Sequence, residues 1–165
     1  MEKKYLIFSD VHGKFGNLEW VLKNEDPFYG AVFCGDGEGL CDVLRNMTGC
    51  PPEIHMVSGN CDWVTGLPEE AVFRIGRHQA FLTHGNRFAV RRGCDIISRA
   101  AQEKGCDLCF FGHTHVPLLK ICGEVLCVNP GSLSEPRGDV ALPSYVIAEV
   151  AEDGEIRFTI KYVTG

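Results

Sequence analysis

The sequence has no long hydrophobic run and no excess of positive charge, and each absence excludes a class of function. No stretch approaches the roughly 20 apolar residues that a membrane-spanning helix needs. The apolar run near the N-terminus, residues 5–8, is too short for a signal peptide and has no cleavage site behind it. The formal net charge is −6, which disfavours broad nucleic-acid binding because such binding depends on a basic surface. We therefore expect a cytoplasmic protein, with no membrane partner and no indication of nucleic acid.

Internal repeats, low-complexity tracts and linkers are also absent. The chain has 165 residues, the size of one domain, and its apolar fraction of 45% is ordinary for a folded protein. We expect residues 1–165 to form a single domain.

Cysteine, by contrast, is abundant. The nine cysteines are odd in number and irregular in spacing. Most lie in apolar runs, as Cys109 does, and free cysteine behaves there as a small buried hydrophobe. Cys106 and Cys109 match C-x-x-C but have no second pair, which disfavours a zinc ribbon. So many unpaired thiols fit a reducing compartment.

Short apolar runs alternate with helical patterns in the first third of the chain. Strands are expected at 5–8, 31–34 and 54–57, and helices at 15–23 and 40–47. This order implies right-handed crossovers and a parallel sheet. Further along, three hairpins, a helix at 96–104 and a strand at 108–111 are expected. So many strands predict two packed sheets with the helices outside.

Polar residues follow several of these runs directly. Asp10 and His12 come after the first strand, and His113 and His115 after the strand at 108–111. In an extended backbone, residues i and i+2 point the same way, so each pair could aim two ligand atoms at one point. Asp36, Asn60 and His84 also follow hydrophobic runs.

Taken singly, each motif also fits an ordinary turn, a helix cap or a structural histidine. Together they favour a metal site, because parallel strands present their carboxyl ends to one crevice. His78, expected at a solvated hairpin tip, and His55, expected to be structural within a strand, are excluded. The candidate metal ligands are Asp10, His12, Asp36, Asn60, His84, His113 and His115. Seven ligands suit two ions, and imidazole with carboxylate favours Mn²⁺, Fe²⁺, Zn²⁺ or Mg²⁺. Two adjacent ions form a clamp for hydrolysing phosphate esters.

The ordered series of these motifs resembles the calcineurin-like metallophosphoesterases over nearly the whole chain. The runs at 59–62 and 129–132 look most like the small YfcE-type phosphodiesterases. The resemblance implies an α/β fold, a four-layer α/β/β/α sandwich of two mixed sheets with flanking helices. It also implies two ligand sets that share Asp36. These are Asp10, His12, Asp36 and His115 for the first metal, and Asp36, Asn60, His84 and His113 for the second.

By the same resemblance, the protein would be a divalent-metal-dependent phosphodiesterase in which a dimetal-bridging hydroxide attacks phosphorus. Mn²⁺ is the first choice of metal, with Zn²⁺, Fe²⁺, Mg²⁺, Ni²⁺ and Co²⁺ as alternatives. The absence of a cap segment favours a small phosphodiester substrate. The alternatives are a phosphomonoesterase and a catalytically weak scaffold of the same fold, like the retromer subunit. Exposed final strands could pair subunits into a homodimer or homotetramer.

Five residues are candidates for catalysis. They are Asp36, Asn60, Cys61, Asp62 and Arg137. Cys61 stands where many relatives carry a histidine, which predicts a preference for esters with good leaving groups or protonation by solvent. Asp62 would orient a ligand histidine or be an ordinary turn carboxylate. Arg137 would contact phosphate or brace its loop through a salt bridge. Asn86, where relatives often have histidine, would alter affinity for the second metal or the product.

Overall fold

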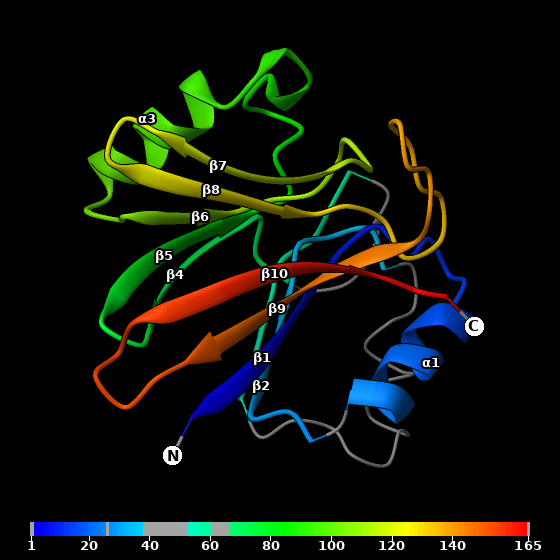
Figure 1. The fold of residues 1–165 in the computed structure, drawn as a ribbon. Coiled ribbons are helices and arrows are strands. Elements are labelled where there is room, and N and C mark those ends of the chain that lie inside the picture. The colour runs from blue at the N-terminus through cyan, green and yellow to red at the C-terminus, as the bar shows by residue number, and fades with distance from the viewer. Residues whose placement is uncertain (1, 26, 38–52, 61–66, 165) are drawn as a thin grey trace.

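Two mixed five-stranded sheets pack face to face in the computed structural model, which describes residues 2–25, 27–37, 53–60 and 67–164 (Figure 1). The first sheet has the order β10-β9-β1-β2-β3 and the second β4-β5-β6-β8-β7. The strands of the first sheet are β1 (Lys3–Phe8), β2 (Gly30–Phe33), β3 (Glu53–Met56), β9 (Ser144–Val150) and β10 (Ile156–Tyr162). Those of the second are β4 (Glu70–Ile75), β5 (His78–Thr83), β6 (Leu108–Phe110), β7 (Pro117–Cys122) and β8 (Val125–Pro130).

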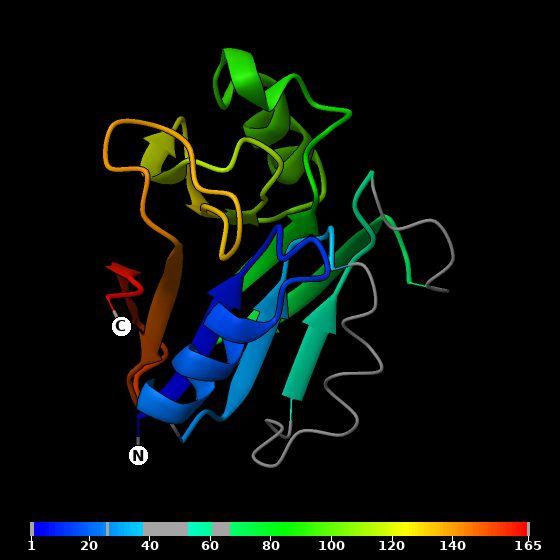
Figure 2. The same cartoon turned by 90° about the vertical axis from the view of Figure 1, so that its right-hand side faces the viewer.

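Helices cover the outer faces of the two sheets. Helix α1 (Gly16–Glu25) lies on the first sheet and α3 (Asp95–Glu103) on the second, at opposite sides of the molecule (Figure 2). The expected four-layer α/β/β/α arrangement is therefore confirmed. No described helix is long and apolar enough to cross a membrane.

The alternation of side chains along β1 explains why the layers form. Tyr5 and Ile7 point into the core between the sheets, whereas Leu6 and Phe8 pack under α1. Successive strand residues face opposite sides, so a strand that is apolar on both sides belongs in the middle of a sandwich. Fully burying one such side chain contributes about 1.5–3 kcal/mol.

The direction of the strands determines where the loops meet. Strands β1, β2 and β3 are parallel, as predicted, and β5, β6 and β8 are also parallel to one another. The carboxyl ends of each parallel set therefore lie at one edge of its sheet. The helix predicted at 40–47 lies outside the described residues.

Most of the predicted elements are found within one or two residues of their expected ends. A short 3₁₀ helix, η1 (Val90–Arg92), was not predicted. The expectation for His78 was wrong, since it is the first residue of β5 and its side chain is only 22% exposed. Its Nδ1 lies 2.6 Å from Asp107 Oδ2, and this carboxylate holds the ring against the protein. His55 lies within β3, stacked on Phe73, which agrees with a structural role.

Candidate metal centre

The candidate centre forms where the carboxyl ends of strands from both sheets meet. Within the first sheet, the Asp10 amide donates to Gly35 O at 3.0 Å. Within the second, the Gly112 amide donates to His84 O at 3.0 Å. His84 then joins the two sheets, because its Nδ1 lies 2.7 Å from Cys34 O. The strand ends of both sheets thus hold one cluster of side chains.

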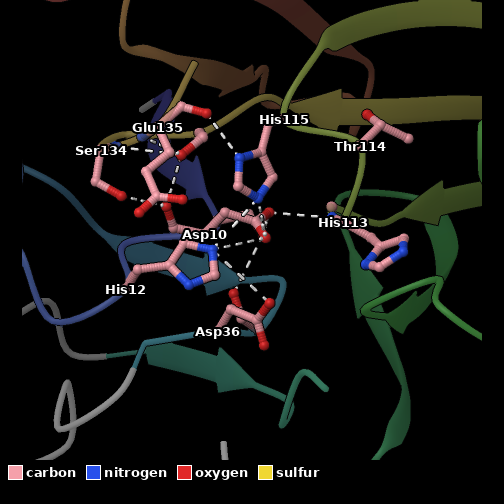
Figure 3. Close-up of polar contacts among 12 residues, drawn as sticks. Asp10, His12, Asp36, His113, Thr114, His115, Ser134 and Glu135 are labelled. Carbon is pink, nitrogen blue, oxygen red and sulfur yellow. Dashed lines mark hydrogen bonds and ion pairs between the residues drawn. The ribbon is translucent and has the colours of Figure 1, made fainter. Parts of the chain in front are cut away.

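The first group of converging ligand atoms belongs to Asp10, His12 and His115 (Figure 3). His115 Nε2 lies 3.2 Å from Asp10 Oδ1 and 3.3 Å from His12 Nε2. His12 Nε2 lies 3.6 Å from Asp10 Oδ1. Metal bonds of about 2.0–2.2 Å separate neighbouring ligand atoms by about 3 Å, so this spacing suits a shared ion.

The second group belongs to Asp10, Asp36 and His84. His84 Nε2 lies 3.1 Å from Asp36 Oδ2 and 3.7 Å from Asp10 Oδ1. Asp36 Oδ2 is also 3.8 Å from His12 Nε2. The carboxylates of Asp10 and Asp36 therefore lie between the histidines of the two groups. All three residues of the second group are buried.

Backbone carbonyls set the tautomer of two histidines. His84 Nδ1 faces Cys34 O, and His115 Nδ1 faces Glu135 O at 2.6 Å. A carbonyl oxygen can only accept a hydrogen bond, so Nδ1 of each ring carries the proton. With Nδ1 held in this way, Nε2 of each ring is directed into the cluster, which is how a backbone-anchored histidine binds metal.

Two buried polar atoms show that the cluster fits a cation. Among the described residues, Asp10 Oδ1 and His84 Nε2 are buried side-chain atoms without a hydrogen-bond partner of acceptable geometry. Leaving such atoms unsatisfied costs about 1–3 kcal/mol each. Both are oxygen or nitrogen donors of the kind that first-row divalent ions accept. The residues present therefore fit the divalent ions that the family resemblance implies.

The charges of the cluster also favour a cation. Burial alone would raise the pKa of Asp10, but contacts with His115 and His12 outweigh it and hold this pKa well below its usual range. For His84, burial lowers the pKa, but the neighbouring carboxylates of Asp36 and Asp10 raise it overall. Both shifts follow from a site in which two carboxylates stabilise positive charge.

The backbone at the site differs from the sequence-based expectation. The i, i+2 argument assumed extended strands, but Asp10 and His12 have φ values of 54° and 50°, and His113 and His115 have 71° and 63°. Asp36 is also left-handed, at 63°. Such conformations cost about 1–3 kcal/mol each in residues other than glycine and cluster at functional sites. The premise of extended backbone was therefore wrong for both pairs.

The two pairs also differ in how their side chains lie. Asp10 and His12 face the same point, whereas His113 and His115 diverge (Figure 3). The His113 ring lies beside the ring of His84, with 5.2 Å between centroids. Its backbone amide donates to Asp10 Oδ2 at 3.0 Å. His113 thus contributes to the site on the side of His84, and its assignment as a ligand stays a prediction.

Gly59 packs against Asp36, and Asn60, the next residue, lines a hollow of about 300 Å³. The hollow is also lined by Asn86 and Arg87, which follow His84 after β5. Arg87 forms an ion pair with Glu69 on the same hollow. Cys61 and Asp62, the next candidates in the chain, lie outside the described residues.

Arg137 is exposed, and its backbone amide donates to His115 O at 3.0 Å. Among the described residues its guanidinium forms no ion pair, so the salt bridge considered as its alternative role is not seen there. The loop itself supports the site, because Ser132 and Ser134 both donate their hydroxyls to Asp10 O. The first of these belongs to the run at 129–132 that carried the family resemblance.

Several supporting residues escaped sequence reasoning. Ser9 donates its hydroxyl to Asp10 Oδ2 at 2.6 Å, and its position beside Asp10 was the only signal. Asn129 donates to Gly112 O and Thr114 Oγ1, which fixes the turn between His113 and His115. At Gly59 and Gly112, an added Cβ would overlap the carboxylates of Asp36 and Asp10, respectively. The glycines of these motifs are therefore needed for close approach to the ligands.

Comparison with known proteins agrees with this geometry. The family model for the calcineurin-like phosphoesterase superfamily domain matches residues 4–153. Phosphodiesterase YfcE of Escherichia coli K12 is 27% identical over 157 residues, with 82% of each chain covered.

Two solved structures share the fold. A predicted phosphoesterase from Streptococcus pneumoniae TIGR4 is 29% identical, with a TM-score of 0.79 over 98% of this chain and 90% of that one. Vacuolar Protein Sorting 29 from Cryptosporidium parvum has a TM-score of 0.75 at 19% identity, with 99% of each chain covered. The second likeness bears on the fold alone. Together with the family match across most of the chain, the site and the sandwich show that this protein belongs to the calcineurin-like phosphoesterase superfamily.

Proposed function

We propose that this protein is a divalent-metal-dependent phosphodiesterase of small substrates. The observation that carries the proposal is the convergence of two buried carboxylates with the Nε2 atoms of three histidines. Among the described residues, two atoms of this cluster, Asp10 Oδ1 and His84 Nε2, have no hydrogen-bond partner of acceptable geometry. Family membership supports hydrolase chemistry at this site. The relative YfcE is named a phosphodiesterase, which supports a phosphodiester as the class of substrate.

Two ions would be held by the residues assigned from the sequence. Asp10, His12, Asp36 and His115 would hold the first, and Asp36, Asn60, His84 and His113 the second. When bound, such ions supply an activated water and Lewis-acid stabilisation of the phosphoryl oxygens. Mn²⁺ is the metal we propose first, since oxygen and imidazole ligands with no thiolate suit it.

The role of the chain is to hold these ligands before any ion or substrate arrives. Ser9 and the His113 amide each donate to Asp10 Oδ2, which leaves Oδ1 directed at the histidines. Carbonyls of Cys34 and Glu135 fix the rings of His84 and His115. Such preorganisation avoids the cost of orienting ligands during the reaction.

We propose the hollow lined by Asn60 as the space for the second substituent of a diester. It has a volume of about 300 Å³ and is lined by polar and charged side chains, among them Asn86 and Arg87. A diester carries a second substituent on phosphorus, and this space could accept it. A phosphomonoesterase remains the alternative within the same chemistry.

The scaffold alternative is disfavoured by the site itself. Every ligand position assigned from the sequence carries a side chain that can bind metal, whereas scaffold relatives that have lost activity have lost ligands. We also propose that residues 1–165 form one domain and that the protein is cytoplasmic. Its pairing into a homodimer or homotetramer stays a prediction.

The test is a substrate panel on metal-stripped protein. Aryl and alkyl phosphodiesters and monoesters would be assayed after Mn²⁺, Mg²⁺ or Zn²⁺ is added back. We expect hydrolysis of diesters, fastest with Mn²⁺. Absence of hydrolysis under every metal would overturn the proposal and favour the scaffold.

The same panel tests the consequence of Cys61. Without a histidine at that position, rates should fall as the pKa of the leaving alcohol rises. Equal rates for aryl and alkyl esters would contradict this expectation.

A further inference from the structure

A second cluster of metal-ligating side chains lies away from the histidines and carboxylates. The sulfur atoms of Cys94, Cys122 and Cys127 all lie within 4.8 Å of one another. The three residues come from separate segments, with Cys94 directly before α3, Cys122 at the end of β7 and Cys127 within β8. The cluster therefore depends on tertiary structure and has no spacing motif in the sequence.

Strand register explains how the thiols meet. Cys122 pairs with Val125, and Lys120 pairs with Cys127. Because side chains alternate along a strand, Cys122 and Cys127 are diagonal neighbours on one face of the hairpin. Val125, Cys127 and Cys94 pack in the apolar cluster beneath α3, which lies over that face (Figure 1). Cys94 enters from the start of the helix.

We propose that Cys94, Cys122 and Cys127 form a second metal site, which binds one thiophilic divalent ion such as Zn²⁺ through three thiolates. Zn–S bonds of about 2.3 Å set two thiolates of a tetrahedral site about 3.8 Å apart, so the observed sulfurs need to move by only about 1 Å. Cys94 and Cys127 are buried, whereas Cys122 is partly exposed and leaves a path for the ion. A water molecule on that side takes the fourth position.

The surroundings shift the pKa values of the three thiols in different directions. Burial, above all, raises the pKa of Cys94 to about 12 and also raises that of Cys122. Hydrogen bonds with Cys109, and then with Cys94 and Cys122, lower the pKa of Cys127 to about 7. The positive charge of Lys120 acts on Cys122 and Cys127 in the same direction. Binding of one divalent ion by three thiols releases three protons and leaves a net charge of −1, which Lys120 offsets. The ion would fasten the start of α3 to the β7–β8 hairpin.

A disulfide is the competing use of these residues. It would join two sulfurs and leave the third unused, whereas an ion uses all three. The six described cysteines, Cys34 and Cys106 among them, are all free thiols.

Cobalt titration of the reduced, metal-stripped protein tests the proposal. Thiolate bound to Co²⁺ gives intense near-ultraviolet charge-transfer absorption, which histidine and carboxylate ligands do not. We expect this absorption to saturate at one equivalent and to disappear when Zn²⁺ is added. Cys122→Ser is the main variant, because its partly exposed side chain can be changed without disturbing the core. The substitution should weaken metal binding by at least about 10- to 100-fold, since mutating a residue that only hydrogen-bonds to a metal ligand already weakens it by that factor.

Two further variants serve as controls. Cys106→Ser removes another buried thiol of the same apolar cluster and should leave the absorption unchanged, as should Cys61→Ser. Phosphodiesterase activity with Mn²⁺ should be unchanged in Cys122→Ser. The proposal is overturned if no charge-transfer band appears, if the band survives in both Cys122→Ser and Cys127→Ser, or if Cys61→Ser abolishes it. Loss of two thiols without metal uptake would also overturn it, in favour of a disulfide.

Discussion

Histidines lie at both ends of the sandwich, and the two ends use them in different ways. At the carboxyl ends of β1, β2, β5 and β6, Nδ1 of His84 and of His115 donates to a backbone carbonyl, and Nε2 of each ring lies within 3.2 Å of a buried carboxylate. At the start of β5, His78 contacts Asp107 through Nδ1 and Glu155 through Nε2. Both ends pair histidine with carboxylate.

The two ends differ in whether the polar atoms around the histidine all have a partner. Around His78 each ring nitrogen has its own carboxylate at the protein surface, so nothing more is needed. Around His84 several nitrogen and oxygen atoms converge in a buried space, and two of them have no hydrogen-bond partner of acceptable geometry within the described chain. Proximity of histidine to carboxylate is therefore weak evidence for a metal, whereas anchored rings with converging, unsatisfied atoms are strong evidence.

The largest effect is expected from Asp36→Asn. The amide keeps the size of the side chain but loses the charge that lies between the two histidine groups. We expect kcat/KM for an aryl phosphodiester with Mn²⁺ to fall at least about 10²- to 10³-fold, the scale of losing one electrostatic stabiliser. Asp107→Asn is the matched control at the other end and should retain activity. Equal losses in the two variants would remove the distinction between the ends.

Metal removal should separate the two ends by stability. A divalent ion at 100 times its dissociation constant stabilises the folded state by about 2.7 kcal/mol, or roughly 5–10 °C in Tm for a chain of this size. Chelation should therefore lower Tm, and Mn²⁺ should restore it. Mn²⁺ is chosen because thiolates bind it weakly. The shift should shrink in His115→Asn, which loses a ligand of the first ion, and persist in full in His78→Asn, as thermal melting would show.

A carboxylate satisfied entirely by protein groups gives the next largest effect. Glu25 at the end of α1 accepts from Lys161 and Tyr145. Burial raises its pKa, but these bonds and the charge of Lys4 lower it overall. The group therefore stabilises the fold above its unfolded pKa of about 4.3, and this contribution is lost as pH falls through the lower folded pKa.

Glu25→Gln should accordingly reduce the free energy of unfolding by about 1–2 kcal/mol at pH 7. Urea denaturation at a series of pH values would measure it. The gap between wild type and variant should close in acid, with activity at pH 7 unaltered. A gap that is independent of pH would show that the charge of Glu25 is not involved.

The smallest effect is expected from His78→Gln. Its contacts are at the surface, where ion pairs contribute about 0–1 kcal/mol, so stability should fall by at most about 1 kcal/mol and activity should stay within twofold. Denaturant unfolding and the diesterase assay would check this. A large loss of activity would mean that the distal end also influences catalysis.

How much of the site was predictable differs from residue to residue. Asp10, His12, Asp36 and His84 could be found because each follows an apolar strand, and parallel strands bring their carboxyl ends together. The divergence of His113 and His115 could only be stated as an implication of the family resemblance, since Asp10 and His12 have the same spacing and the same left-handed backbone but face one point. The prediction of a solvated His78 was wrong because the sequence pattern shows the turn at Gly76 but not the contact between His78 and Asp107, which follows α3 in the chain.

The sequence by itself determined the layered fold and the chemical class of the main site. Hydrophobic periodicity selects helices and two-sided strands, and the order of strands brings the polar residues to one edge. Only the tertiary structure decided which atoms converge. The anchoring carbonyls of Cys34 and Glu135, the serines behind Asp10 and the cysteine cluster under α3 all join distant segments. Such contacts depend on packing between layers, and no local sequence pattern encodes them.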